Sequence, residues 1–200
     1  MPKLIIFDFD GVIVDSLHAA HSVWAEAGAT ITVTEYTKHF EGNIHSAPKP
    51  IATLDFAASY ATKTPLLKTF PGIYEVIKTL SQHYVLTINS SSYTDMIRQV
   101  LVNHNLSSYF HSVLGADVAT SKVEKIKLAI ANHQTAPDQT IMITDTLGDL
   151  REANQVGLKT IAVTWGFHDL TTLQKGYPTT SVDQPTDIIK QVDKILNPLS

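Results

Sequence analysis

The chain has 200 residues, of which 44% are hydrophobic and 17% charged, so it can bury a large core and general disorder is excluded. Its formal net charge is -4, with 15 Lys and Arg residues and no long basic run, which argues against nucleic acid as the main partner. It contains no cysteine, which excludes disulfides, thiolate catalysis and thiolate metal sites and fits a reducing compartment.

The N-terminal segment MPKLIIFDFDGVIVDS superficially resembles a signal peptide. However, Asp8 and Asp10 interrupt its apolar run, and no small-residue cleavage site follows. No segment reaches the roughly 18 to 20 consecutive apolar residues that a membrane-spanning helix needs. We therefore expect a cytoplasmic protein without a membrane partner.

The first predicted element is a buried strand at Lys3–Phe9, and the next convincing strand-helix alternation begins only near residue 70. The stretch between them contains three segments with a helical pattern, at His18–Ala27, Thr34–Phe40 and Ile51–Tyr60. The simplest interpretation is a small helical cap at residues 16–67, inserted between the two parts, 1–15 and 68–200, of a core domain.

From residue 70 onward, predicted helices and strands alternate. The strands are short continuous apolar runs, typical of strands covered on both faces, at Tyr84–Asn89, Ser112–Gly115, Thr140–Thr144 and Thr160–Thr164. The helices carry apolar residues on one face, at Gly72–Ser81, Asp95–Val102, Lys122–Asn132, Leu147–Val156 and Thr186–Leu196. This alternation predicts an α/β fold with a mostly parallel, doubly wound, Rossmann-like sheet.

Two of the predicted helices carry a capping signal at their start. Ser121 followed by Glu124 fits a capping box, in which the serine hydroxyl accepts from the backbone of the third helical residue. Ser92 followed by Asp95 is a weaker version of the same pattern. We expect both serines to begin helices.

Polar residues follow the predicted strands at the ends where a doubly wound sheet binds its ligands. The first strand leads into Asp8 and Asp10, and the fourth leads into Asp145 and Asp149. The predicted helix after the third strand begins at Lys122. Crowded carboxylates repel one another unless a cation binds or they take up protons, and oxygen ligands of this kind suit Mg²⁺. The sequence therefore predicts a magnesium site at this edge of the sheet.

Four segments resemble, in the same order, motifs of the haloacid dehalogenase-like hydrolase superfamily. They are DFDGVIVDS from Asp8, FPGIYEVIKTL from Phe70, GADVATSKVEKI from Gly115 and ITDTLGDLREANQVGLKTIAVTWGF from Ile143. The sequence is most similar to the phosphoglycolate phosphatase and β-phosphoglucomutase-like branch, whose cap is inserted at the same place.

The resemblance implies a role for each matching residue. Asp8 is expected to attack phosphorus and form an aspartyl-phosphate, while Asp10 protonates the leaving oxygen and then activates water. Lys122 is expected to neutralise phosphoryl oxygens. Mg²⁺ is expected to bind to Asp8, to the backbone carbonyl of Asp10 and to Asp145, with Asp149 as a further ligand or as a partner behind the ligands.

The second motif of the family places a Ser or Thr at the end of the second strand, where this sequence has Asn89 and Ser90. Counting back without gaps from the following helix favours Ser90. We expect Ser90 to donate a hydrogen bond to the phosphate, with Asn89 as the neighbouring candidate.

These motifs predict Mg²⁺-dependent hydrolysis of a small phosphorylated metabolite. A phosphomutase would share every core residue, but the scattered Lys38, Lys49 and Lys63 of the cap favour hydrolysis weakly. Dehalogenation is disfavoured because Asp10 is retained. From other classes, a receiver-like phospho-acceptor would carry its acceptor Asp on a middle strand, and a non-catalytic scaffold would not need the acidic residues.

Overall fold

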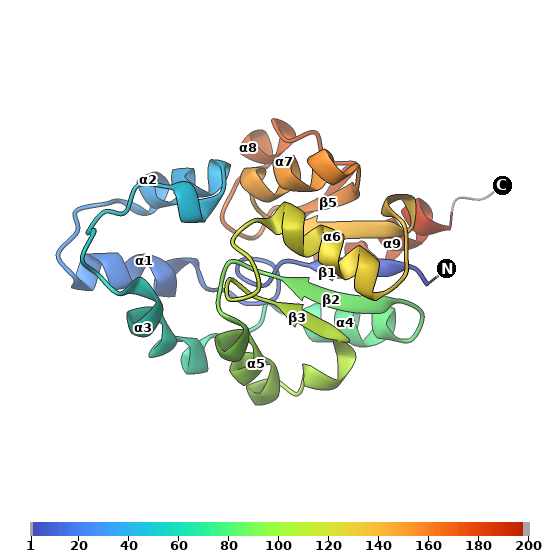
Figure 1. Cartoon of the computed structure of the whole chain (residues 1–200), viewed down its shortest axis with the longest axis horizontal. Helices are drawn as coiled ribbons and strands as arrows, with labels where there is room; N and C mark the ends of the chain where they lie inside the picture. The colour runs from blue at the N-terminus through green and yellow to red at the C-terminus, as the bar shows by residue number, and fades with distance from the viewer. Residues whose placement is uncertain (1, 198–200) are drawn as a thin grey trace.

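The computed structural model describes residues 2–197, which form a parallel six-stranded sheet with helices on both faces and a helical lobe beyond one end (Figure 1). The sheet order is β3-β2-β1-β4-β5-β6, so the chain moves outward from β1 in both directions. The strands are β1 (Leu4–Phe7), β2 (Val85–Asn89), β3 (Ser112–Leu114), β4 (Thr140–Thr144), β5 (Lys159–Val163) and β6 (Thr180–Val182). This arrangement confirms the predicted doubly wound α/β fold.

The central strand β1 explains why the sheet forms at these residues. Its four residues, LIIF, are fully buried, and alternate side chains enter different core clusters. Ile5 and Phe7 pack with side chains of α4 (Ile73–Ser81), α5 (Thr94–Asn103) and α9 (Asp187–Leu196). Leu4 and Ile6 pack with side chains of α6 (Lys122–Asn132) and α7 (Leu147–Val156). A strand covered on both faces has to be apolar at every position, which is the continuous pattern of the sequence.

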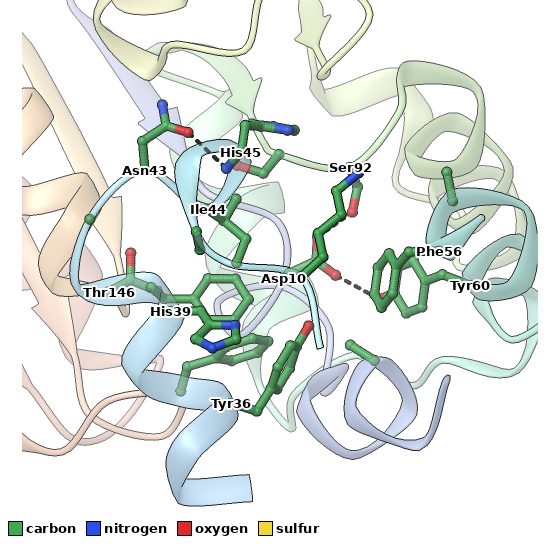
Figure 2. Close-up of a pocket in the computed structure, with 18 of the residues that line it drawn as sticks. Asp10, Tyr36, His39, Asn43, Ile44, His45, Phe56, Tyr60, Ser92 and Thr146 are labelled. Atoms are coloured by element: carbon green, nitrogen blue, oxygen red, sulfur yellow. Dashed lines mark hydrogen bonds between the residues drawn. The ribbon is translucent and has the colours of Figure 1, made fainter. Parts of the chain in front are cut away.

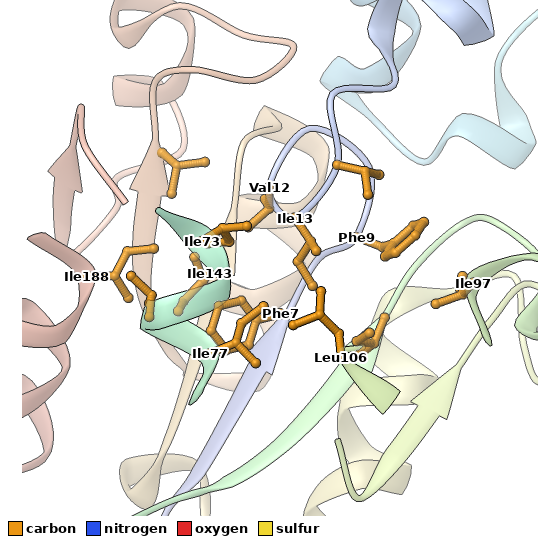
Figure 3. Close-up of a cluster of buried hydrophobic side chains, with 14 of the residues drawn as sticks. Phe7, Phe9, Val12, Ile13, Ile73, Ile77, Ile97, Leu106, Ile143 and Ile188 are labelled. Carbon is orange, nitrogen blue, oxygen red and sulfur yellow. The ribbon is translucent and has the colours of Figure 1, made fainter. Parts of the chain in front are cut away.

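Helices α4 (Ile73–Ser81) and α9 (Asp187–Leu196) lie together behind the sheet, and α6 (Lys122–Asn132) and α7 (Leu147–Val156) lie in front of it (Figure 1). Figure 3 shows Phe7 and Ile143 of the sheet meeting Ile77 of α4 and Ile188 of α9. Burying a side chain of this size contributes about 1.5–3 kcal/mol. Helix α5 (Thr94–Asn103) supplies Ile97 to the same cluster.

The strand register brings the predicted site residues to one edge. Phe7 of β1 pairs with Ile88 of β2 on one side and with Ile143 of β4 on the other. The residues that follow these three therefore emerge side by side at the carboxyl end of the sheet. Asp8 and Asn89 are two of them.

Two short elements were missed from the sequence, and one helical segment was placed too early. Strand β6 has three residues and α8 (Leu170–Gln174) has five, which is too short to show a period. The predicted helix at Ile51–Tyr60 begins only at α3 (Phe56–Ala61), where the Asp55 carboxylate accepts a hydrogen bond of 3.0 Å from the Ala58 N–H.

The two predicted serine caps differ in outcome. Ser121 caps α6, and its hydroxyl accepts from the Glu124 N–H as expected. Ser92 does not cap α5, because that helix begins at Thr94 and Asp117 accepts from the Thr94 N–H at 2.7 Å. The Ser92 hydroxyl is instead directed to Asp10.

The lobe between β1 and α4 contains α1 (Leu17–Glu26), α2 (Val33–Lys38) and α3, joined by short 3-10 turns at His39–Glu41, Ile44–Ser46 and Thr64–Leu66. The chain leaves and re-enters the core side by side, since the Asp15 N–H donates to the Lys68 carbonyl at 2.9 Å and Val14 bridges to Thr69. We propose that residues 16–67 are a cap on the core formed by residues 2–15 and 68–197; residue 1 and residues 198–200 of the predicted core lie outside the described residues.

Within residues 2–197, none of the helices has both the length and the apolar character required to cross a membrane.

Candidate active site

Asp8, Lys122 and Asp149 form a buried charged cluster at the carboxyl end of the sheet. The Lys122 ammonium lies 2.8 Å from Asp8 Oδ1 and also pairs with Asp149 Oδ2. Asp8 directly follows β1, Lys122 is the first residue of α6, and Asp149 lies in the first turn of α7. One cation therefore joins two carboxylates that come from distant parts of the chain.

Burial and pairing act in opposite directions on these groups. Burial raises the pKa of Asp8 well above its usual value, although Lys122 offsets part of the effect. Burial also acts to raise the pKa of Asp149, but the Lys122 ammonium and a hydrogen bond of 2.8 Å from Thr144 keep it below the ordinary value. Burial acts to lower the pKa of Lys122, but Asp149 and Asp8 outweigh it and raise that pKa. Lys122 is therefore a permanent cation beside Asp8.

Asp10 lies past the end of β1, and three hydroxyl groups hold its carboxylate. Tyr60 donates to Oδ1 at 2.8 Å, while Ser92 and Ser90 donate to Oδ2 at 2.7 and 3.3 Å. Figure 2 shows Asp10 between Ser92 on the core side and Tyr60 of α3. The side chain is thus fixed jointly by the core and by the inserted lobe.

Asp145 follows β4 and has one oxygen without a partner. Its Oδ2 accepts from the Phe167 N–H at 2.7 Å, but the buried Oδ1 has no hydrogen-bond partner among residues 2–197. Burial raises the pKa of Asp145 to about 7. Any side chain at Gly11 or Gly166 would overlap the Asp145 carboxylate, and Gly11 also has a φ of +78°. The carboxylate is thus closely surrounded on one side and unpaired on the other.

These features fit a bound Mg²⁺. An unpaired buried carboxylate oxygen is costly, and a cation would satisfy it. No cluster of three His, Asp or Glu side chains able to hold a metal occurs within residues 2–197. Mg²⁺ does not need one, because it is usually held by one or two carboxylates and keeps several waters. Asp8, Asp145 and the backbone carbonyl of Asp10 would be such a set. Asp149 Oδ2 is already engaged by Lys122 and Thr144.

The two candidates for the second motif differ in what they contact. The Asn89 amide donates to the Lys122 carbonyl at 3.2 Å, and its own carbonyl oxygen is buried without a partner in the described chain. Asn89 thus supports the start of α6. The Ser90 hydroxyl faces Asp10, as given above, and accepts from the Ser92 N–H at 3.0 Å.

Sequence reasoning missed three residues of this site. Tyr60 and Ser92 bind the Asp10 carboxylate, and the fully buried Lys125 donates to the Ser90 carbonyl. Burial, reinforced by the nearby Lys122, lowers the pKa of Lys125 to about 8. A signal existed for Lys125, because it lies three residues after Lys122 on the same face of α6. No local signal marks Tyr60.

A cavity of about 400 Å³ connects the charged cluster to the inserted lobe. Its floor includes Asp8, Asp10 and Lys122. Much of the remaining lining is aromatic, namely Trp24, Tyr36, Phe40, Phe56, Tyr60, Tyr93 and Phe167. A cavity of this size can enclose a small organic molecule with its reacting group on the floor.

The lobe lies very close to the core at Gly148, which has no side chain. A Cβ at this position in α7 would overlap the Gly42 carbonyl oxygen and lie 2.9 Å from that of Phe40. Ala normally stabilises a helix relative to Gly by up to about 1 kcal/mol. Here we expect Gly148→Ala to lower kcat/KM by about tenfold, because the lobe has to move away from the floor.

The matched control for this prediction is Gly42→Ala, on the other side of the same contact, whose added methyl group would meet no atom within 4 Å. Steady-state kinetics of both variants with p-nitrophenyl phosphate test the contact. Equal kcat/KM for Gly148→Ala and the wild type would show that the close approach is unimportant.

Comparisons with known proteins agree with this geometry. Residues 5–163 match the family model described as haloacid dehalogenase-like hydrolase. The chain is 27% identical to the phosphoglycolate phosphatase of Synechococcus elongatus, with 97% of this chain and 99% of that protein covered. It is 22% identical to the phosphoglycolate phosphatase of Aquifex aeolicus, with 96% and 97% covered.

Among solved structures, a haloacid dehalogenase-like hydrolase of Streptococcus pneumoniae superimposes with a TM-score of 0.81 at 25% identity. The superposition covers 95% of this chain and 98% of that one. The similarity therefore extends over the inserted lobe as well as the sheet.

Proposed function

Because the chain belongs to the haloacid dehalogenase-like hydrolase family, in its phosphoglycolate phosphatase-like branch, we propose that it is a Mg²⁺-dependent phosphatase of a small phosphate monoester. The observation that supports this most is that Asp8, Asp10 and Lys122 line one cavity floor, next to the unpaired oxygen of Asp145. The substrate phosphate would lie against the paired Asp8 and Lys122 side chains, with its alcohol portion in the cavity above.

In the first step, a carboxylate oxygen of Asp8 attacks phosphorus and the bond from phosphorus to the ester oxygen breaks. Asp10 gives its proton to the departing alkoxide, and Asp8 becomes an aspartyl-phosphate. Lys122 and the Ser90 hydroxyl would hold the phosphoryl oxygens during this transfer. Asp8, the Asp10 carbonyl and Asp145 would hold Mg²⁺, which would help to neutralise the phosphoryl charge.

In the second step, Asp10 takes a proton from a water molecule as the water attacks phosphorus. The bond from phosphorus to Asp8 breaks, which releases inorganic phosphate and restores both carboxyl groups. The hydroxyls of Tyr60 and Ser92 orient Asp10 for both proton transfers. Because Tyr60 comes from the cap, Asp10 is fully held only when the cap lies over the floor.

The metal proposal is tested with Asp145→Asn. In the wild type, MgCl₂ should raise the melting temperature and EDTA should abolish turnover of p-nitrophenyl phosphate. In Asp145→Asn, we expect kcat to fall at least about 100-fold and the Mg²⁺-induced rise in melting temperature to disappear.

The same variant should be more stable than the wild type in EDTA at pH 8, because it removes the cost of burying a charged carboxylate. Differential scanning fluorimetry measures both effects. A wild type that turns over equally well in EDTA would contradict the metal proposal. Release of inorganic phosphate in equal amount to the alcohol distinguishes hydrolysis from phosphomutase chemistry.

A further inference from the structure

One wall of the cavity is a ladder of aromatic rings that begins at Asp10. Tyr60 donates to Asp10, and its ring stacks on Phe56 with centroids 5.6 Å apart and planes 19° apart. Phe56 in turn stacks on Trp24, at 5.1 Å and 24°. Figure 2 shows Phe56 and Tyr60 side by side, with the Tyr60 hydroxyl directed at Asp10. The ladder leads from the leaving-group position into the cap.

Three other rings of the lining meet edge to face. Tyr36 and Phe40 have centroids 5.3 Å apart at 86°, and Phe40 and Phe167 have centroids 4.8 Å apart at 79°. In Figure 2 the hydroxyl end of Tyr36 points toward Asp10. Burial and the charge of Asp10 raise the pKa of Tyr36, so this hydroxyl is a neutral donor. The lining around these rings is mainly apolar, and its charged residues other than those of the floor include Lys49, Asp55 and Glu152.

The cavity lacks a buried cation for a second negative group. Lys122 is the one buried lysine or arginine among the described residues that line it, and it is held by Asp8 and Asp149. Lys49 lines the cavity from an exposed position, and burial and Lys125 lower the pKa of His45. A carboxylate bound among the rings would be unpaired, which is strongly unfavourable. A two-carbon acid would also leave most of the 400 Å³ unfilled.

A buried donor in the aromatic wall adds a polar requirement. The Trp24 ring lines the cavity and is only 6% exposed. Its indole Nε1–H lies near the Tyr36 hydroxyl, a contact that acts to lower the pKa of Tyr36, but it makes no hydrogen bond of normal geometry within residues 2–197. Buried N–H groups are nearly always paired, so an unpaired one beside a cavity indicates a ligand acceptor.

We infer that the alcohol portion of the substrate is a planar, uncharged ring that carries a hydrogen-bond acceptor for the Trp24 indole N–H. The ring packs against the aromatic lining while its phosphate lies on Asp8. This inference deepens the phosphatase function proposed above and rests on it. It selects ring-bearing phosphate esters over phosphoglycolate, the substrate named for the relatives.

The first test compares esters whose alcohols have similar leaving ability. Benzyl phosphate and cyclohexylmethyl phosphate are similar in size and differ in planarity. With Mg²⁺ at pH 8, we expect kcat/KM for benzyl phosphate to be about three- to tenfold higher, which is the usual contribution of an aromatic contact. We expect kcat/KM for phosphoglycolate to be lower than for benzyl phosphate. The inference is overturned if kcat/KM is higher for phosphoglycolate than for benzyl phosphate, or if kcat/KM for cyclohexylmethyl phosphate equals that for benzyl phosphate.

The second test removes the donor with Trp24→Phe, which keeps a ring. In the wild type, one of the isomeric pyridylmethyl phosphates should exceed benzyl phosphate in kcat/KM by about fivefold, because its nitrogen accepts from Trp24. In Trp24→Phe this ratio should fall to about one. A general loss of cap stability lowers both values but does not change their ratio. Leu66→Ala, an exposed apolar residue of the cap outside the cavity, should leave the ratio unchanged. A ratio that survives in Trp24→Phe contradicts the assignment of the donor.

Binding by calorimetry separates this inference from the proposed function. Benzylphosphonate and cyclohexylmethylphosphonate cannot be hydrolysed, so their dissociation constants do not depend on catalysis. Tighter binding of benzylphosphonate without turnover of any ester would support the ring site and contradict the phosphatase proposal. Turnover of several esters without any preference for rings would support the phosphatase proposal and contradict the ring site.

Discussion

Asp8→Asn should lower kcat for p-nitrophenyl phosphate in MgCl₂ by about 10⁴-fold or more, which is the usual result of removing a catalytic nucleophile. An amide cannot form the aspartyl-phosphate and is a poor ligand for Mg²⁺. The variant should still fold, because burial already disfavours the charged form of Asp8 and Lys122 keeps Asp149 as its partner. Loss of activity would therefore reflect chemistry and not unfolding.

The control is Asp15→Asn, an exposed acid of the same motif, which should keep wild-type kcat and melting temperature. The rate of phosphate release measures turnover, and circular dichroism during heating measures the melting temperature. If Asp8→Asn retained most of the wild-type turnover, Asp8 would not be the nucleophile and the proposed function would have to be abandoned.

Lys122→Met should lower the free energy of unfolding by about 3–5 kcal/mol in metal-free buffer at pH 8. The ammonium is the shared partner of Asp8 and Asp149, and all three side chains are buried. Removing it leaves two buried carboxylates close together without a counter-ion. Urea denaturation should show a smaller loss at pH 5 than at pH 8, because a buried carboxyl group without its cation can take up a proton. Catalysis should fall as well.

Lys127→Met is the matched control, since Lys127 is exposed on the same helix and should change stability by less than about 0.5 kcal/mol. Adding Asp149→Asn to Lys122→Met removes one of the unpaired charges, so the double variant should regain part of the stability but none of the activity. Equal stability of Lys122→Met and Lys127→Met would mean that the buried pairing contributes nothing.

The acidic part of the site was predictable because it follows from strand order along the chain. Continuous apolar runs marked β1 and β4 as buried strands, and parallel strands in one sheet end at the same edge. Asp8 and Asp145 directly follow these strands, so their meeting requires only that β1 and β4 be neighbours, as they are. The capping pattern likewise placed Lys122 correctly at the start of α6.

The contacts made by the cap were not predictable in the same way. Tyr60 binds Asp10 across 50 positions of sequence, and it reaches that carboxylate because α3 folds back over the floor. The pattern at Ser92 predicts a helix cap, whereas the Ser92 hydroxyl donates to Asp10 instead. In each case a local pattern allows several partners, and the packing of distant segments selects one.

The sequence by itself determined the α/β class, the order of the acidic motifs and the edge of the sheet at which they gather, because these depend on local periodicity and on parallel strand geometry. Only the tertiary structure decided which hydroxyls hold Asp10, that Asn89 turns to α6, and that aromatic rings line the cavity. Those features depend on how the lobe at residues 16–67 packs on the core, and that packing arises from contacts between segments that have no fixed spacing in the chain.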